Sequence, residues 1–342
     1  MKLEFPLIEV KGTAYEMGRQ HGEQAGDLVR KYLLLIERLA GKPREILCRN
    51  AERFLEVIER LSPRYVEEVR GLAEGAEISF AEALLCQVRT QALYGGEAGC
   101  TAFALRGEAT LDGQILIGQN QEFEPEFAEV ATLLRVCPTD GRPRALMITF
   151  AGQLGYSGIN EFGVAHFANA LFNCNLRLGV PPYPMKRVML EQRSVGEAIA
   201  LLERHNASTA GNVVLADGQG EIADVEFRPE GTAIYRDEHP DMRLHSNHYV
   251  ASEFAAFEDH TVADSPARLC RMRTLLRKSW GRITVDVLKE VLADHEGDPA
   301  GICRHGASNW HTVFGYIAEP ARRVFHLRRG HGCLGTWGTY TV

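Results

Sequence analysis

Cys100 is the residue of this 342-residue chain whose surroundings best suit nucleophilic chemistry. It follows Gly99 and precedes Thr101, within the stretch AGCTAFALRGEATLDGQILIGQN at 98–120. A free thiol has a pKa of about 8.5, so it becomes a nucleophile only beside a base or a positive charge. The base can be a histidine, or the α-amino group created when the chain is cut directly before the nucleophile. The second route needs a small residue there, and Gly99 meets that need.

The other cysteines show no sign of a disulfide framework. The chain has eight cysteines, and no two of them stand in a C-x-x-C arrangement. Disulfide frameworks are typical of short secreted chains, whereas this chain is long and begins with MKLEFPLIEVKG, which contains no apolar signal segment. We expect most of the others to be reduced, buried and inert: Cys48, Cys86, Cys137, Cys174, Cys270, Cys303 and Cys333.

A helical region precedes Cys100, from Thr13 to about residue 94. In GDLVRKYLLLIERLAG the apolar residues Leu28, Tyr32 and Leu35 recur at helical spacing, and Gly41 ends the pattern. Further helices are predicted over 45–61, from Pro63, and after Ser79 as an N-cap, and the glycines at 95 and 96 end the region.

After residue 99 the pattern changes to short β-rich segments separated by Gly, Asp or Pro turns. Four such segments come first, at 100–107, 114–120, 130–137 and 144–152, and more follow at 163–171, 211–229 and 312–327. Helices are predicted between them, near 185–193, 195–204, 266–278 and 284–292. Consecutive hairpins with helices inserted in pairs predict antiparallel sheets covered by helices, an α+β layered architecture.

Several motifs occur together in a fixed order along the chain. GTAYEMGRQHGEQAG opens the helical region, and GCTAF, LDGQILIGQNQEF, GYSGINEFGVAHFANAL, HSNHY and DSPARLCRMRTLL follow. In this combination the sequence resembles the acyl-coenzyme A:isopenicillin N acyltransferase family of cysteine N-terminal-nucleophile hydrolases, which also includes choloylglycine hydrolase relatives. The resemblance implies a four-layer αββα fold with an N-terminal helical prosegment. It also implies a cut between Gly99 and Cys100, giving a small chain of residues 1–99 and a catalytic chain of residues 100–342.

The resemblance also assigns site residues. Cys100 would be the nucleophile and, after self-cleavage, the new N-terminus. Glu122 in QNQEF stands where the family has an Asp in Q-N-W-D-W that contacts the nucleophile's amine. Asn169 and Asn247 would form the oxyanion hole, since a side-chain amide donates hydrogen bonds without needing a charge. Arg268 would orient the nucleophile or bind a substrate carboxylate.

Each assignment has a structural alternative. Glu122 is also explained as a surface carboxylate beside neighbouring glutamates, and Asn247 as a polar loop residue. Arg268 follows Asp264 by four residues, the spacing of an ion pair on a helix surface. Asn160 in GINEFG is predicted to form a turn rather than to take part in catalysis.

A zinc site is a competing interpretation. Cys303, His305, His331 and Cys333 supply two thiols and two imidazoles, in two pairs at i, i+2 spacing. Residues at that spacing share one face of a strand, so a four-ligand site is possible. Structural zinc sites more often use C-x₂₋₄-C or H-x₃₋₅-H spacing, so the sequence favours an enzyme without a bound metal or any other cofactor.

Two further alternatives concern Cys100 itself. A papain-like Cys–His pair would use His166, His248 or His311 as its base, but the segment around Cys100 lacks that family's local signature. The second alternative is that the chain is a non-catalytic protein that binds a small molecule, which would hold if the bond before Cys100 is never cut.

The charge and hydropathy of the chain restrict the classes of partner that we expect it to bind. The formal net charge is −7, with no block of Lys and Arg, which argues against a nucleic-acid partner. No apolar run approaches 18 residues, so we expect a cytoplasmic protein that does not use a membrane. The expected function is a self-processing amidohydrolase or acyltransferase. Its partners would be a small-molecule acyl donor, either an amide or a thioester, and an amine or water acceptor, while its two cleaved chains stay associated.

Overall fold

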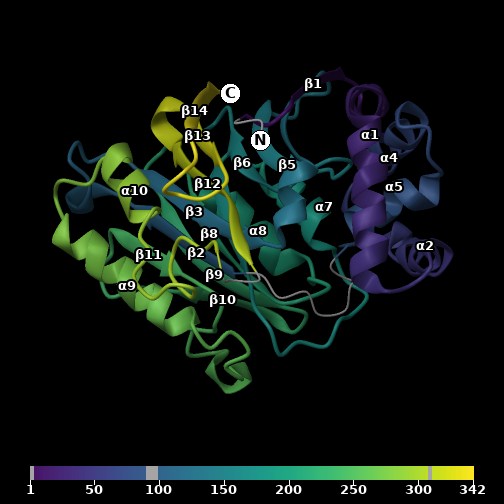
Figure 1. Ribbon diagram of the computed structural model, residues 1–342. Helices are drawn as coiled ribbons and strands as arrows, with labels where there is room; N and C mark the ends of the chain where they lie inside the picture. Colours follow the sequence, from purple (N-terminus) through teal and green to yellow (C-terminus); the bar gives the residue numbers. More distant parts are fainter. Residues whose placement is uncertain (1–3, 90–98, 307–309) are drawn as a thin grey trace.

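Two β-sheets face each other at the centre of the protein (Figure 1). The computed structural model describes residues 4–89, 99–306 and 310–342. The eight-stranded sheet has, in spatial order, β1 (Leu7–Gly12), β4 (Ala131–Pro138), β5 (Ala145–Phe150), β6 (Ser157–Asn160), β7 (Ala165–Ala170), β8 (Gly211–Ala216), β9 (Ile222–Arg228) and β10 (Gly231–Tyr235). The six-stranded sheet has β11 (Met242–His245), β2 (Gly99–Leu105), β3 (Leu116–Phe123), β12 (His311–Glu319), β13 (Val324–Arg329) and β14 (Trp337–Thr341).

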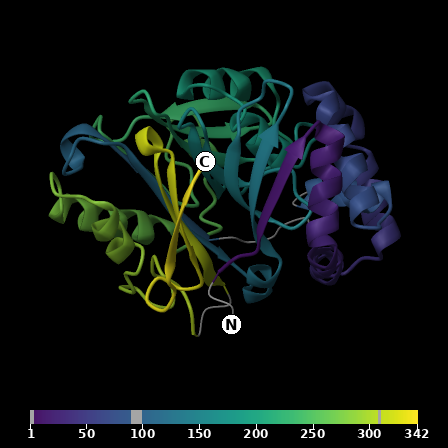
Figure 2. The same cartoon turned by 90° about the horizontal axis from the view of Figure 1, so that it is seen from above.

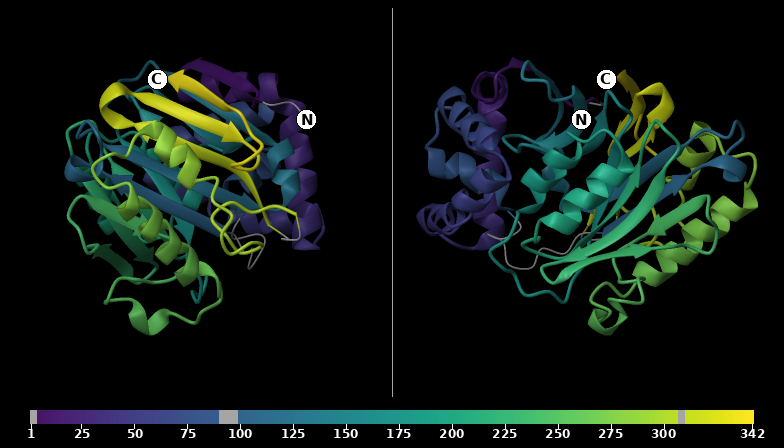
Figure 3. Two further views of the ribbon diagram at one scale, coloured as in Figure 1. Left: turned by 60° about the vertical axis from the view of Figure 1, so that its left-hand side comes forward. Right: turned by 180° about the vertical axis from the view of Figure 1, so that it is seen from behind.

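Helices cover the outer sides of this pair of sheets, as the view from above shows (Figure 2). The long helix α9 (Ser265–Lys278) and the short α10 (Val285–Val291) pack on the six-stranded sheet. Helices α7 (Pro182–Met189) and α8 (Val195–Arg204) pack on the eight-stranded sheet. The helices formed by residues 14–87 lie beside its β1 end (Figure 3): α1 (Ala14–Ala40), α2 (Arg44–Glu52), α3 (Leu55–Leu61), α4 (Pro63–Gly75) and α5 (Phe80–Gln87). None of the helices in the described ranges is long and apolar enough to cross a membrane.

Glycines let α1 and α4 pack unusually close together. A Cβ atom on Gly18 would lie 1.9 Å from the backbone oxygen of Glu68, and one on Gly71 would lie 2.1 Å from that of Tyr15. Gly18 and Gly22 of GTAYEMGRQHGEQAG therefore serve helix packing. The N-terminus of α1 is set by a capping box, in which the side chains and backbone of Thr13 and Glu16 bond reciprocally.

The first strand is a feature that the sequence analysis did not predict. β1 pairs in parallel with β4, with Leu7 opposite Leu133, at the edge of the eight-stranded sheet. Residues 1–99 thus contribute a sheet strand as well as helices. Val10 on β1 is buried, while Leu7 and Glu9 are exposed, so the strand is half-buried and its apolar signal is short.

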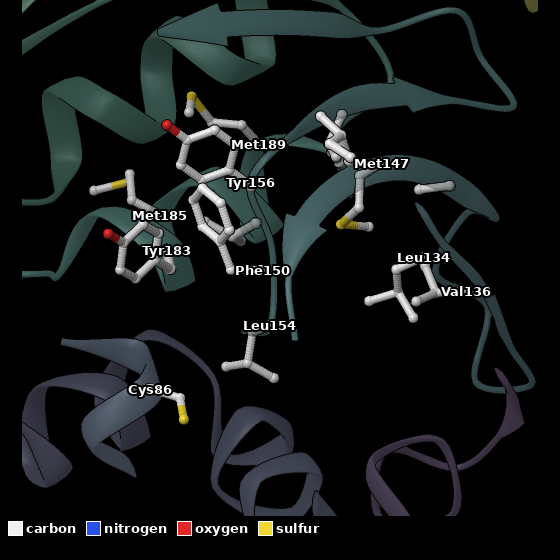
Figure 4. Close-up of a cluster of buried hydrophobic side chains, with 14 of the residues drawn as sticks. Cys86, Leu134, Val136, Met147, Phe150, Leu154, Tyr156, Tyr183, Met185 and Met189 are labelled. Carbon is white, nitrogen blue, oxygen red and sulfur yellow. The ribbon is translucent and has the colours of Figure 1, made fainter. Parts of the chain in front are cut away.

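The interior near β4, β5 and α7 is apolar and aromatic. Figure 4 shows Phe150, Tyr156 and Tyr183 packed beside Met185 and Met189. Cys86 from α5 is part of the same core, and burial raises the pKa of its thiol well above the ordinary range, as expected of an inert cysteine. All eight cysteines are free; Cys48, Cys86, Cys100 and Cys303 are buried, whereas Cys270 and Cys333 are exposed, which the sequence analysis did not expect.

Strands β2 and β3 present alternate residues to two different layers. Ala102 and Ala104 face the core between the sheets, whereas Phe103 and Leu105 face α9 and α10. By the same alternation Cys100 points between the sheets. Its neighbour across the strand pair is Gln121, and Gly99 lies opposite Glu122 on the other face.

Candidate active site

Cys100 is the second residue of β2, and its side chain is fully buried. Gln121 on β3 donates a hydrogen bond from Nε2 to the Cys100 sulfur at 2.9 Å. The hydroxyl of Tyr316 on β12 lies 2.9 Å from Gln121 Oε1 and 2.5 Å from Gln119 Oε1, so the two glutamines share its single proton. The backbone N–H of Ala170, at the end of β7, also contributes a hydrogen bond to the sulfur.

The thiol is protonated in the continuous chain. Burial raises the pKa of the Cys100 thiol to about 12, and the Glu122 carboxylate adds to that rise, while the charges of Arg268 and Lys186 oppose it. The sulfur is therefore surrounded by hydrogen-bond donors and cations yet is not ionised at neutral pH. Its activation requires a change in what surrounds it.

The backbone of Cys100 is held on both sides. Its N–H donates to Asn247 Oδ1 at 2.8 Å, and its carbonyl oxygen accepts from Arg268 Nη1 at 2.6 Å. Arg268 also donates to Thr101 Oγ1 at 2.8 Å and to Asn247 Oδ1 at 2.9 Å. Arg268 pairs with Asp264 at 2.9 Å, but it is buried, so the pair does not lie on the helix surface. The structure thus brings Asn247 and Arg268 to Cys100.

Glu122 lies on the other face of β3, beside Gly99. It is fully buried, so the interpretation as a surface carboxylate is wrong. Its Oε1 accepts from Thr312 Oγ1 at 3.0 Å, and its Oε2 has no hydrogen-bond partner within the described part of the chain. A Cβ atom on Gly99 would lie 3.2 Å from that Oε2 and 3.3 Å from Arg304 Nη1. Burial raises the pKa of Glu122 to about 7, against the lowering effects of Arg304 and Arg268.

Asn169 lies one residue before the N–H that contacts the sulfur. Its Nδ2 donates to the backbone oxygen of Ser246 at 2.8 Å, and its Oδ1 accepts from Gln119 Nε2 at 2.6 Å. Asn247 Nδ2 likewise donates to the backbone oxygen of Ala170 at 3.0 Å. Because an amide nitrogen carries two hydrogens, each asparagine has a second N–H that these bonds do not use. These bonds join the end of β7 to the segment after β11.

Three residues near Cys100 and Gly99 were missed by the sequence analysis: Gln121, Lys186 and Arg304. Gln121 belongs to the run QNQE at 119–122, four consecutive polar residues in a strand that is buried on both faces. Such a run is unusual in a core strand and is a usable signal for a site. Lys186 and Arg304 carry no comparable signal, since they lie on a short helix and in a loop.

Lys186 on α7 lies close enough to Cys100 for their charges to interact. It is half-buried, and its Nζ lies 3.7 Å from the centre of the Tyr156 ring. Burial lowers the pKa of Lys186 to about 7, and the nearby Cys100 thiol partly opposes this. A lysine in this state exchanges a proton near neutral pH.

The histidines proposed for a papain-like pair lie elsewhere. His166 Nε2 is 2.8 Å from the backbone oxygen of Lys186, and burial lowers the pKa of His166 to about 3. His248 Nδ1 is 2.7 Å from Ser265 Oγ, and burial lowers its pKa to about 4. His311 packs against the ring of His331. In the described ranges none of the three hydrogen-bonds to the Cys100 sulfur, so the papain-like arrangement is not formed.

Asn160 has the predicted role in a turn. Its Oδ1 accepts the backbone N–H groups of Phe162 at 3.0 Å and Val164 at 2.9 Å. Its Nδ2 donates to the backbone oxygens of Leu190 and Gln192. Asn160 therefore ties the β6–β7 turn to the end of α7.

Three of the four residues considered for zinc do come together. Cys303, His305 and Cys333 lie in one cluster, but its fourth member is His295. His331 packs its ring against His305 instead, with the ring centres 4.7 Å apart.

The sequence has relatives over almost its whole length. The model of the acyl-coenzyme A:6-aminopenicillanic acid acyl-transferase family matches residues 109–331. The 40 kDa form of acyl-coenzyme A:6-aminopenicillanic-acid-acyltransferase from Emericella nidulans is 30% identical over 338 residues, covering 94% of this chain and 92% of that protein. An uncharacterized protein from Archaeoglobus fulgidus is 22% identical, covering 84% of this chain and 57% of that protein.

The fold is shared with a solved structure. A mutant of the conjugated bile acid hydrolase from Clostridium perfringens matches with a TM-score of 0.51 and 13% identity, over 71% of this chain and 97% of that chain. Together with the two facing sheets and their helical covers, this confirms the predicted αββα N-terminal-nucleophile hydrolase fold. Since the family match spans more than half of the chain and the fungal relative covers nearly all of it, this chain belongs to the acyl-coenzyme A:6-aminopenicillanic acid acyl-transferase family.

Proposed function

We propose that this chain is a self-processing acyl-transfer enzyme whose nucleophile is Cys100. The observation that carries the proposal is the way the structure holds one cysteine. Asn247 and Arg268 fix its backbone N–H and carbonyl, and Gln121 donates to its sulfur. A buried cysteine that served only packing would not need charged and polar groups at its nitrogen, oxygen and sulfur.

The first reaction would be cleavage of the chain before Cys100. The sulfur attacks the carbonyl carbon of Gly99, and Lys186 accepts the thiol proton. The C–N bond then breaks, the Cys100 nitrogen takes up a proton, and a thioester joins Gly99 to the sulfur. Water hydrolyses the thioester, leaving a carboxyl group on Gly99 and a free thiol and amine on Cys100. A larger residue in place of Gly99 would crowd Glu122 and Arg304, since a Cβ atom there would lie 3.2 and 3.3 Å from these side chains.

Glu122 would then become the partner of the new α-amino group. Its Oε2 lacks a hydrogen-bond partner within the described residues and lies beside Gly99, the residue whose bond to Cys100 would be cut. A buried carboxylate without a partner is unfavourable, whereas one that faces an ammonium group is stabilised. Glutamate is one methylene longer than the aspartate of the family pattern, and Thr312 holds its other oxygen at 3.0 Å.

The mature enzyme would transfer an acyl group in two steps. The Cys100 amine takes the thiol proton as the sulfur attacks the carbonyl of an amide or thioester. The second N–H groups of Asn169 and Asn247 stabilise the oxyanion. The leaving amine or thiol takes the proton, and an acyl-cysteine remains. An amine or water then attacks that intermediate, accepts the acyl group and restores the thiol.

The donors we propose are acyl thioesters and amides, and the acceptors are amines or water. Both the chemistry and the relatives support this choice of donors. Exchange between a cysteine thiol and a thioester is close to isoenergetic. The fungal relative is named as an acyl-coenzyme A acyltransferase, and the structural neighbour as a conjugated bile acid hydrolase.

The experiment is an intact-mass measurement of the purified protein under denaturing conditions. Two species are expected, residues 1–99 and residues 100–342, and Cys100→Ala should give only the full chain without turnover. Cys270→Ser is the matched control, since that cysteine is exposed on α9, and it should process normally. A wild-type chain that stays intact yet turns over an acyl thioester would overturn the amine-as-base mechanism. An intact and inactive chain would favour a binding protein instead.

A further inference from the structure

Four side chains with metal-binding atoms meet in the segments that precede β12 and β14. They are His295, Cys303, His305 and Cys333, and their ligand atoms all lie within 4.8 Å of one another. Three come from the segment between α10 and β12, and Cys333 comes from the segment between β13 and β14. We propose that these four residues bind one zinc ion, in a structural site that fixes the loop carrying Arg304; its link to catalysis rests on the proposed function.

The distances within the cluster are close to those of a tetrahedral site. His295 Nε2 lies 2.8 Å from His305 Nε2, and Cys333 Sγ lies 3.4 Å from His305 Nε2. With Zn–N of about 2.0–2.1 Å and Zn–S of about 2.3 Å, neighbouring ligand atoms of tetrahedral zinc are roughly 3.3–3.8 Å apart. Two imidazole nitrogens that face each other repel unless one carries a proton, whereas a metal ion accepts both lone pairs. Side-chain shifts of about an ångström would complete the site.

The groups around the two cysteines suit thiolates. The backbone N–H of Gly332 donates to Cys303 Sγ at 3.1 Å. The buried Arg328 guanidinium interacts electrostatically with both Cys303 and Cys333. Hydrogen bonds and positive charge at the sulfurs stabilise the deprotonated ligands, and the two thiol protons are released when zinc binds. Cys333 is exposed, which provides a route for the ion to enter.

The site is joined to the nucleophile through Arg304, which lies between two of the ligands in the chain. Its guanidinium pairs with Asp264 at 2.6 Å, and Asp264 also pairs with Arg268. Its backbone N–H donates to Thr312 Oγ1 at 2.9 Å, and that hydroxyl donates to Glu122. Zinc bound by Cys303 and His305 would therefore restrain the groups beside Gly99. Four protein ligands leave no open position, so the ion would be structural and not catalytic.

The sequence pattern pointed to a different set, because His331 stands two residues from Cys333. In the structure the ring of His331 packs on His305, and His295 supplies the fourth nitrogen. The pair His295 and His331 therefore provides a sharp comparison, since both contact His305 and only one belongs to the cluster.

The test is metal analysis of the full chain after chelation and reloading with Zn²⁺ alone. We expect about one zinc per chain in the wild type and in the matched controls His331→Ala and Cys270→Ser. Cys333→Ser and His295→Ala should bind more weakly by a factor above about 10–100, the loss usual when only a residue that supports a ligand is changed. Loading with Co²⁺ should give the visible absorption of a tetrahedral thiolate site in the wild type and not in Cys333→Ser.

Several results would overturn the proposal. Background zinc in the reloaded wild type would do so, as would a disulfide between Cys303 and Cys333 in non-reducing peptide maps. Full zinc occupancy in both Cys333→Ser and His295→Ala, with both variants folded by circular dichroism, would show that other residues bind the ion. The measurement is independent of self-processing, because Cys100→Ala should bind zinc as the wild type does.

Discussion

At the scale of single residues, Gln121 donates a hydrogen bond to the sulfur of Cys100. It stands where the family pattern Q-N-W-D-W has its first tryptophan. Gln121 links the Cys100 sulfur to the hydroxyl of Tyr316. That hydroxyl also bonds to Gln119 Oε1 and Ser157, so Tyr316 keeps partners when Gln121 is changed. Gln121 can therefore be probed without leaving a buried hydroxyl unpaired.

We predict that Gln121→Leu slows self-cleavage and turnover by about 10–100-fold, because a hydrogen bond to a charged group contributes about 1.5–3 kcal/mol. The pKa of the thiol in the mature enzyme, followed by the pH dependence of alkylation, should rise. Gln121→Glu should raise it more, since a carboxylate adds negative charge beside the sulfur. A purely structural role predicts a lower melting temperature with an unchanged thiol pKa, and that result would contradict the prediction.

Glu122 makes the stability of the uncut chain depend on pH. Burial raises the pKa of Glu122 from 4.5 to about 7, so the folded chain holds this proton over a range where the unfolded chain has lost it. The neutral carboxyl imposes no penalty below pH 4.5, and stability falls as pH rises from there through 7. A rise of this size in the pKa corresponds to a loss of about 3 kcal/mol in the free energy of unfolding.

We expect this loss in Cys100→Ala, which keeps the chain continuous, when urea unfolding is compared at about pH 5 and about pH 8. Adding Glu122→Gln should remove most of the difference, because the amide does not ionise and can still accept from Thr312. Comparing the two variants cancels the other titrating groups of the protein. Equal pH dependence in both would show that Glu122 is ionised throughout that range.

Residue types and order indicated much of the site, but not all of it. Cys100, Asn247 and Arg268 were named from motifs, and the structure brings them into contact. Arg304 and His295 were not, since their positions depend on how a loop between α10 and β12 folds back. A loop has no periodicity from which the direction of its side chains can be predicted.

At the scale of elements, helices and strands with a regular apolar pattern were predicted correctly, and one strand with a weak pattern was missed. The predicted helix over 195–204 coincides with α8, because Ser194 caps it and its apolar face is regular. β1 was missed, since a half-buried parallel edge strand of six residues has too few apolar positions to stand out. Its partner strand, β4, is also distant in the sequence, so no local pattern indicates that the two strands pair.

The α1–α4 helix pair gives a prediction at this scale. Gly71→Ala should destabilise the protein by about 1–3 kcal/mol, because its methyl group would lie 2.1 Å from the Tyr15 backbone oxygen and would push the helices apart. Gly26→Ala on α1 is the matched control, since its nearest neighbour is the flexible Arg30 side chain at 3.3 Å. That change should be neutral or stabilising by up to about 1 kcal/mol. Thermal unfolding checks both, and equal effects would show that close glycine packing is unimportant.

At the scale of the whole molecule, the bond before Cys100 separates two pieces that share one core. Residues 1–99 supply β1, which pairs with β4, and helices whose buried residues belong to the same apolar cluster as the facing sheets. Tyr32 packs on Phe150, and His21 accepts a hydrogen bond from the backbone of Gly152. Arg187 on α7 pairs with the buried Glu68 on α4. A cut at one bond removes none of these contacts.

We therefore predict that the cleaved chains stay together and separate only when the protein unfolds. Native mass spectrometry or gel filtration should give one species with the mass of both chains, and urea should release them in the same transition that unfolds the sheets. Glu68→Ala removes one of the two carboxylates that pair with the buried Arg187, leaving Glu191, and should weaken this association by about 1.5–3 kcal/mol. The exposed charge pair of Arg70 with Glu67, also on α4, makes the control, and breaking it should change the association by less than about 1 kcal/mol. Release of residues 1–99 from an otherwise folded catalytic chain would show that the small chain is only a prosegment and not part of the mature core.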